Sequence, residues 1–158
     1  MAILTEEMKQ FVSEQRLGFI ATVCPDNTPN LSPKGTLTVW DNEHLVFADI
    51  RSPGTIGNLR LNRSVEVNVV DPIIRKGWRF KGEATILESG PQFEEITKKI
   101  YHTDKQEVTR NNIRAVVLIE VARALPLISP TYDRGRTENE VRGEWEGYWE
   151  GIRKKRTA

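Results

Sequence analysis

The stretch Ala48-Asp49-Ile50-Arg51-Ser52-Pro53-Gly54-Thr55 joins a strand-like run to a short helix. The run from His44 to Asp49 favours a strand, and Ser52 followed by Pro53 is a typical start for a helix that extends to about Asn62. A cationic side chain, two hydroxyl groups and the free amides of a first helical turn therefore meet at one point. Because such amides and the helix dipole both favour negative charge, the stretch predicts a site for an anion such as a phosphate. A helix that begins with Ser-Pro and binds nothing is the alternative interpretation.

Strand-like segments lie on both sides of this stretch and follow one another through short connections. Apolar and polar residues alternate from Val65 to Val69 and from Trp78 to Ile86, which is typical of strands with one buried face. The segment from Ile113 to Val121 is more continuously apolar. Short connections join antiparallel neighbours, because parallel strands need long crossovers. We therefore expect a mainly β protein, a six-stranded antiparallel barrel with peripheral helices, since closure removes sheet edges. The expected strands are Leu17 to Val23, Leu31 to Trp40, His44 to Asp49, Val65 to Val69, Trp78 to Ile86 and Ile113 to Val121.

Capping patterns predict three further helices. Thr5 is a suitable cap for a first helix, and Pro91 suits the opening of another. Thr137-Glu138-Asn139-Glu140 has the spacing of a capping box, so a C-terminal helix is expected at about residues 137–154. Its aromatic residues fall on one face and predict packing against the core, with a stacking platform for a flavin or nucleobase as the alternative. They are Trp145, Tyr148 and Trp149.

Composition limits the classes of protein to which the chain can belong. Its 158 residues suit one domain over 1–158, and 23 basic against 22 acidic residues give a net charge of +1, which argues against nucleic acid or an anionic membrane as partner. One cysteine, no membrane-spanning apolar run and no signal-peptide pattern predict a cytoplasmic protein. The two histidines, His44 and His102, have no carboxylates at metal-ligand spacing, so no metal site is expected.

The order of several motifs resembles the pyridoxamine 5'-phosphate oxidase-related, FMN-binding split-barrel family. The resemblance runs from about residue 6 to residue 121. The motifs are Ser32-Pro33-Lys34-Gly35, Leu45 to Ile50, Thr55 with Asn58-Leu59-Arg60, and Gly77-Trp78-Arg79-Phe80-Lys81-Gly82-Glu83-Ala84.

This resemblance implies a homodimer with one FMN in each of two clefts at the subunit interface. The flavin ring would lie against Pro33, Lys34, Gly35 and Thr36 and against Ala48, Asp49 and Ile50. The phosphate would lie near Arg51, Ser52 and Thr55, with Lys34 and Asn58 as further polar contacts, and Trp78 and Arg79 would reach the partner's flavin. From the residues alone, Lys34 also fits an exposed lysine that protects a sheet edge, and Asn58 fits a solvated helix residue.

The resemblance also suggests an FMN-dependent oxidoreductase that acts on a small organic substrate, with a reduced nicotinamide as a further reactant. The chain departs from the enzymes that oxidise pyridoxamine phosphate, because the basic C-terminal segment that binds their substrate cannot be aligned. Gly54 also stands where many members have lysine, and Arg51 is the candidate to replace that charge. The alternatives are a non-catalytic flavin module that stores FMN, carries electrons or acts as a sensor, a split barrel that uses deazaflavin or haem, and a small barrel that binds nucleic acid.

Overall fold

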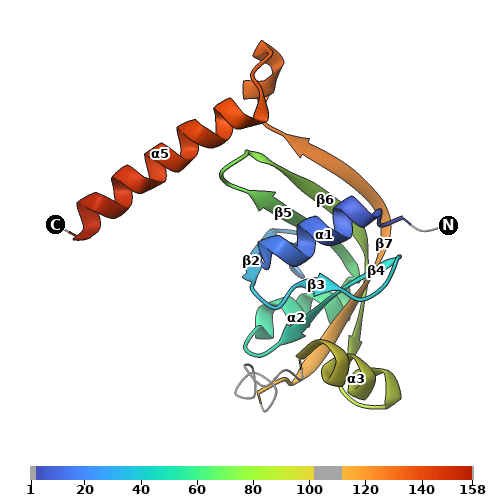
Figure 1. Cartoon of the computed structure of the whole chain (residues 1–158). Coiled ribbons are helices and arrows are strands. Elements are labelled where there is room, and N and C mark those ends of the chain that lie inside the picture. Colours follow the sequence, from blue (N-terminus) through green and yellow to red (C-terminus); the bar gives the residue numbers. More distant parts are fainter. Residues whose placement is uncertain (1–2, 102–111, 158) are drawn as a thin grey trace.

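The computed structural model describes residues 3–101 and 112–157, which form one curled, seven-stranded antiparallel sheet with helices at its margins (Figure 1). The strand order is β2-β1-β5-β6-β7-β4-β3. This architecture confirms the expected antiparallel split barrel. The strands are β1 (Gly18–Val23), β2 (Pro29–Lys34), β3 (Thr38–Val39), β4 (His44–Asp49), β5 (Ser64–Asp71), β6 (Lys76–Leu87) and β7 (Ala115–Ile128).

The helices begin where the capping patterns predict. Thr5 Oγ1 accepts a hydrogen bond from the Met8 amide, and Pro53 and Pro91 each occupy the first turn of a helix. The Thr137 hydroxyl and the Glu140 carboxylate cap the last helix reciprocally, so the predicted capping box is confirmed. The helical segments are α1 (Glu6–Gln15), α2 (Pro53–Leu61), α3 (Pro91–Ile96), the π-helical η1 (Thr97–Tyr101), the 3-10 helix η2 (Pro130–Arg134) and α5 (Glu138–Thr157).

The inner face of the curled sheet carries the main hydrophobic core. Alternate residues of β5 point inward, and α1 and α2 add their apolar sides. A second, smaller cluster packs α3 and η1 against β4 and β7. Fully buried members of the main core include Ile20, Leu45, Phe47, Val67, Phe80 and Ile119. Because both sides of β4 are covered, it presents a nearly continuous buried run.

The expected single strand from Leu31 to Trp40 is wrong, and this raises the strand number from six to seven. The chain leaves β2 after Lys34 and crosses to the other edge of the sheet, where the short β3 pairs with β4. Thr36, in the connection, donates from Oγ1 to the Ala48 carbonyl oxygen and accepts from the Ala48 amide, both at 3.1 Å. These bonds fix the end of β2 beside the end of β4, because the sheet curls far enough for its two edges to approach.

Helix α5 does not pack as the sequence predicted. It leaves the end of β7 through η2 and projects from the body of the molecule (Figure 1). Val141 is its one buried residue among those described, while Tyr148 is 54% and Trp149 41% exposed. The expectation of an inner face packed on this chain's own core is therefore wrong. No helix in the described parts of the chain is long and apolar enough to cross a membrane.

Candidate functional site

The start of α2 is shaped by a buried carboxylate at the end of β4. Asp49, 6% exposed, accepts a hydrogen bond from the Ser52 amide to Oδ1 at 2.8 Å. This bond turns the chain out of the strand, and Pro53 then begins the helix. Ser52 occupies the N-cap position, but its side chain makes no capping hydrogen bond. The interpretation of Ser52 as a capping side chain is therefore wrong, and its hydroxyl stays available.

Three polar side chains at this corner lack partners within the described part of the chain. Arg51 is exposed, Ser52 is half-buried, and Thr55 is only 3% exposed, yet none of their side chains has a hydrogen bond or ion pair there. The amides of Gly54 and Thr55 lie in the first helical turn, which has no acceptor within the helix itself. The corner therefore combines one cation, two hydroxyl groups and free amides, a donor set that suits an anion.

Lys34 adds a second cation that is buried rather than exposed. Its side chain, 7% exposed, donates from Nζ to the Ser32 hydroxyl. Burial lowers the pKa of the Lys34 ammonium, and the nearby Asp49 carboxylate partly opposes that shift. The interpretation of Lys34 as an exposed, edge-protecting lysine is wrong, although β2 does form a sheet edge. Lys34 and Arg51 are therefore the two cations at this corner, one buried beside Asp49 and one exposed.

A chain of hydrogen bonds holds the β2–β3 connection against this corner. The Tyr101 hydroxyl donates to the Thr36 carbonyl oxygen at 3.0 Å, and the Thr36 hydroxyl bonds both backbone groups of Ala48. Burial raises the pKa of Tyr101, so this phenol stays protonated and remains a donor. Tyr101 ends η1, and nothing in its local sequence pattern indicated this supporting contact.

Asn58 anchors α2 to β1 instead of facing solvent. The side chain is 6% exposed and donates from Nδ2 to Thr22 Oγ1 at 3.0 Å, with Cys24 Sγ at 3.5 Å. The interpretation of Asn58 as a solvated helix residue is therefore wrong. Its contact with a bound group remains a prediction. The Thr22–Asn58 bond joins two segments 36 residues apart, which local sequence patterns do not reveal.

The structure brings together most, but not all, of the residues predicted for the cofactor. Lys34, Thr36, Ala48 and Asp49 are linked by the contacts above, and Ile50, Arg51, Ser52 and Thr55 follow in the chain. Gly35 is exposed in the same connection, while Pro33 lies opposite Phe19 in the sheet.

Two of the predicted residues belong to another strand, β6. Trp78 packs partly against the main core. The Nε atom of Arg79 lies 3.1 Å from Glu66 Oε1, an ion pair without hydrogen-bond geometry at Nε. Neither Trp78 nor Arg79 has a described hydrogen bond or ion pair with the start of α2. This is what we expect if both residues serve the partner subunit's site. That role remains a prediction.

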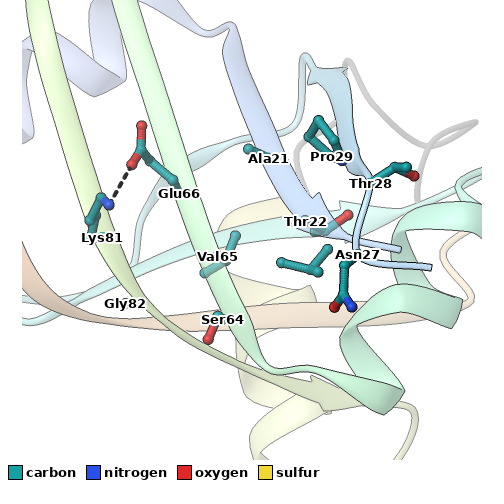
Figure 2. A pocket seen from close by; sticks show the side chains of 11 residues that line it. Ala21, Thr22, Asn27, Thr28, Pro29, Ser64, Val65, Glu66, Lys81 and Gly82 are labelled. Carbon is teal, nitrogen blue, oxygen red and sulfur yellow. Dashed lines mark ion pairs between the residues drawn. The ribbon is translucent and has the colours of Figure 1, made fainter. Parts of the chain in front are cut away.

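A separate hollow of about 450 Å³ lies where β1 and β5 part (Figure 2). The two strands pair only from Phe19 to Ala21, so the residues beyond, near Thr22 and Ser64, are no longer held together by a ladder. An ion pair between Glu66 and Lys81 flanks the hollow at 3.1 Å. None of the predicted cofactor residues lines it.

Metal chemistry finds no support among the described residues. Residues 3–101 and 112–157 contain no group of three or more His, Cys, Asp or Glu side chains that could hold an ion. His44 instead lies 2.8 Å from Asp41, through Nδ1 and a carboxylate oxygen. His102 lies outside the described residues.

Comparison with known proteins identifies relatives of this fold. The family model described as pyridoxamine 5'-phosphate oxidase matches residues 4–126. The crystal structure of HupZ from Group A Streptococcus is 30% identical, with a TM-score of 0.69 over 79% of this chain and 94% of that one. An FMN-binding protein from Syntrophomonas wolfei is 18% identical, with a TM-score of 0.63 over 78% and 85% of the two chains. A structure named F420 reductase is 19% identical, with a TM-score of 0.58 over 77% and 98%. The last two likenesses concern the fold alone. No curated protein matched the chain.

Proposed function

The chain belongs to the pyridoxamine 5'-phosphate oxidase family, and we propose that it binds FMN with the phosphate at the start of α2. The observation that carries the proposal is the set of donors at Arg51, Ser52 and Thr55 that have no partner among residues 3–101 and 112–157, next to the free amides of the first helical turn. A phosphate carries a charge of about −1.5 to −2 and three acceptor oxygens. This corner supplies a charged donor, the Arg51 guanidinium, and uncharged donors, the hydroxyl groups and backbone amides.

The neighbouring residues suit the rest of the cofactor. The ring would lie along the end of β4, from Ala48 to Ile50, opposite the connection that contains Thr36. Lys34 would face the bound group from the buried side, where a cation interacts more strongly with negative charge than at the surface. The hydrogen bonds from Tyr101 and Thr36 would keep this wall rigid, so that less ordering is needed on binding.

Two copies of the chain would complete each site. The family resemblance implies a homodimer, and Trp78 and Arg79 on β6 would then face the flavin bound by the partner. Arg79 is held by Glu66, which is itself paired with Lys81, so its guanidinium is positioned before a ligand arrives. This arrangement would account for Trp78 and Arg79, which have no described hydrogen bond or ion pair with their own α2 corner.

With FMN bound, we propose an oxidoreductase that acts on a small organic substrate, with a reduced nicotinamide as electron donor. FMN would supply the redox chemistry, while the protein would orient it and limit access of water. No residue is assigned as acid or base, since no described contact singles out one of the buried titratable groups Lys34, Asp49 and Tyr101 for that role. A flavin module without a substrate of its own is the alternative within the same fold. Deazaflavin is a further candidate because one structural relative is named F420 reductase.

Absorbance and binding measurements on the purified chain test these proposals. We expect a flavin spectrum as purified or after addition of FMN, with FMN bound more tightly than riboflavin because the phosphate contributes to affinity. Equal affinity for FMN and riboflavin would overturn the phosphate site. Tighter binding of deazaflavin or haem than of FMN would assign that group as the cofactor instead. Oxidation of a reduced nicotinamide with a panel of acceptors then separates an enzyme from a module, since a module binds FMN without turnover.

A further inference from the structure

The hydroxyl group of Thr36 stands where a main-chain pair would continue the sheet. The Trp40 amide donates to the His44 carbonyl oxygen at 3.0 Å, so the backbone of His44 faces β3. Alternate residues of an antiparallel strand face the same neighbour, so Ala48 faces this side too, and the register of β3 with β4 makes residue 36 its partner. The ladder between the two strands nevertheless ends two residues before this pair.

One side chain supplies both hydrogen bonds that the missing pair would have made. Thr36 Oγ1 accepts from the Ala48 amide and donates to the Ala48 carbonyl oxygen, both at 3.1 Å. The main chain at Thr36 is therefore held away from β4 by the length of this side chain. Its carbonyl oxygen, released from the sheet, accepts instead from the Tyr101 hydroxyl at 3.0 Å.

Buried contacts fix the connection between β2 and β3 on its other sides. Leu37 is 3% exposed and packs in the main core beside Gly18, where an added Cβ atom would lie 2.2 Å from Leu37 Cδ2. Tyr101 is also 3% exposed and reaches Thr36 from η1, 65 residues further along the chain. The position of this connection is thus set by two hydroxyl groups and one apolar anchor, where a strand would use its own backbone.

We propose that Thr36 and Tyr101 are positioning residues of the flavin site, which hold the β2–β3 connection at the distance from the end of β4 that the flavin ring requires. The inference rests on the proposed function, in which the ring lies between this connection and residues 48–50. Both hydroxyl groups already donate within the chain, so they act through the placement of the backbone. A wall that is fixed before binding lowers the entropy lost when a ligand is ordered against it.

Titrations with FMN and with riboflavin test the proposal. Thr36→Val keeps the shape of the side chain and removes two hydrogen bonds, so both flavins should bind about tenfold more weakly. Tyr101→Phe removes one hydrogen bond between uncharged groups and should weaken both about fivefold. The factor should be the same for FMN and riboflavin, because the connection faces the ring that the two ligands share.

Three further variants separate positioning from a general loss of stability. Thr36→Ser keeps the hydroxyl group and should bind both flavins nearly as tightly as wild type. Thr38→Val makes the same exchange two residues away, at a hydroxyl group without a hydrogen bond in the described part of the chain. Tyr132→Phe removes a phenol that donates to the Ile74 carbonyl oxygen at 2.6 Å, far from the connection in sequence. The last two variants should leave both affinities unchanged.

The double variant Thr36→Val with Tyr101→Phe shows whether the two residues act together. Groups in one hydrogen-bonded network have effects that do not add, so the loss of affinity should be smaller than the product of the two single losses. Effects that simply multiply would mean that each residue acts by itself, and the joint role would be wrong.

Hydrogen exchange of the flavin-free chain gives a readout that needs no cofactor. The Ala48 amide should exchange about tenfold faster or more in Thr36→Val, since its acceptor is lost. The neighbouring amide of Phe47 faces β7 in the ladder and should exchange as in wild type. Unchanged exchange at Ala48 would contradict the role of the Thr36 hydroxyl group.

The outcomes distinguish this inference from the proposed function. A wild-type chain that binds neither flavin refutes the proposed function, and this inference with it. A chain that binds FMN while a folded Thr36→Val variant binds both flavins as wild type does refutes the positioning role alone. So does Thr36→Ser binding as weakly as Thr36→Val, or a loss of affinity for FMN only. If Thr36→Val does not fold, Tyr101→Phe decides: unaltered affinities for both flavins would then refute the role.

Discussion

The phosphate corner makes a quantitative prediction for the double variant Arg51→Ala with Thr55→Val. Thr55 as a residue is only 3% exposed, so a bond from its hydroxyl to a charged phosphate would be largely shielded from water, and its loss should cost about 1.5–3 kcal/mol. Arg51 is exposed, and water and salt screen its charge, so its loss should cost only about 0.2–1 kcal/mol. The sum of about 2–4 kcal/mol corresponds to FMN binding that is about 25-fold to 700-fold weaker.

Parallel titrations with FMN and riboflavin, followed by flavin fluorescence, measure this effect. Riboflavin lacks the phosphate, so its affinity should change little in the double variant. Valine has nearly the shape of threonine, and the midpoint of thermal unfolding should therefore stay close to that of wild type. Arg60→Ala, at the other end of α2 and paired with Glu88 at the surface, is the matched control and should leave both affinities unchanged. An unaltered ratio of FMN to riboflavin affinity in the double variant would refute the placement of the phosphate.

Three further predictions concern the buried polar groups and the backbone around the site. Burial lowers the pKa of Lys34 from its ordinary value of 10.5. The ratio of FMN affinity to riboflavin affinity should fall as the pH rises through that lowered pKa, because deprotonation removes a cation that attracts the phosphate. In Lys34→Met the ratio should be independent of pH above about 7.5, where the phosphate is already fully ionised. Asn58→Ala should lower the free energy of unfolding by about 0.5–1.5 kcal/mol in urea titrations, because the Thr22 hydroxyl loses the shorter of its two donors and keeps only Asn30 at 3.3 Å; no measurable loss would show that the bond does not anchor α2. Gly82→Ala should destabilise by about 3 kcal/mol or more, since the added carbon would lie 1.9 Å from the Glu120 carbonyl oxygen, whereas Gly147→Ala has open space and should not destabilise.

Local patterns were sufficient wherever neighbouring residues fix the structure. Thr5 and the pair Thr137 and Glu140 mark helix starts, because a cap satisfies amides only a few residues away. Pro53 marks another, because its fixed backbone angle suits the first helical turn. Alternation along β5 gave its buried side correctly, since successive side chains of a strand point to opposite faces. These rules act within one turn or one strand, and they hold whatever surrounds the segment.

The errors arose where segments distant in the sequence meet. A run from Leu31 to Trp40 is compatible with one strand, but curling of the sheet places its two halves at opposite edges. The same curling buries Lys34 beside Asp49, although a lysine next to a proline in an edge strand is ordinarily exposed. The roles of Asn58 and Tyr101 likewise depend on contacts 36 and 65 residues away, for which a single sequence carries no signal.

Periodicity, the Ser-Pro helix start and the order of motifs along the chain were enough to predict the antiparallel split barrel, the start of α2 and the residue types at the anion corner. The folded chain had to be seen to learn which of those groups lack a partner among the described residues, which cation is buried, and that α5 leaves the body with Tyr148 and Trp149 exposed. Burial and pairing are properties of surfaces that meet through space, and a helix has the same amphipathic pattern whether its apolar side packs on its own chain or on another.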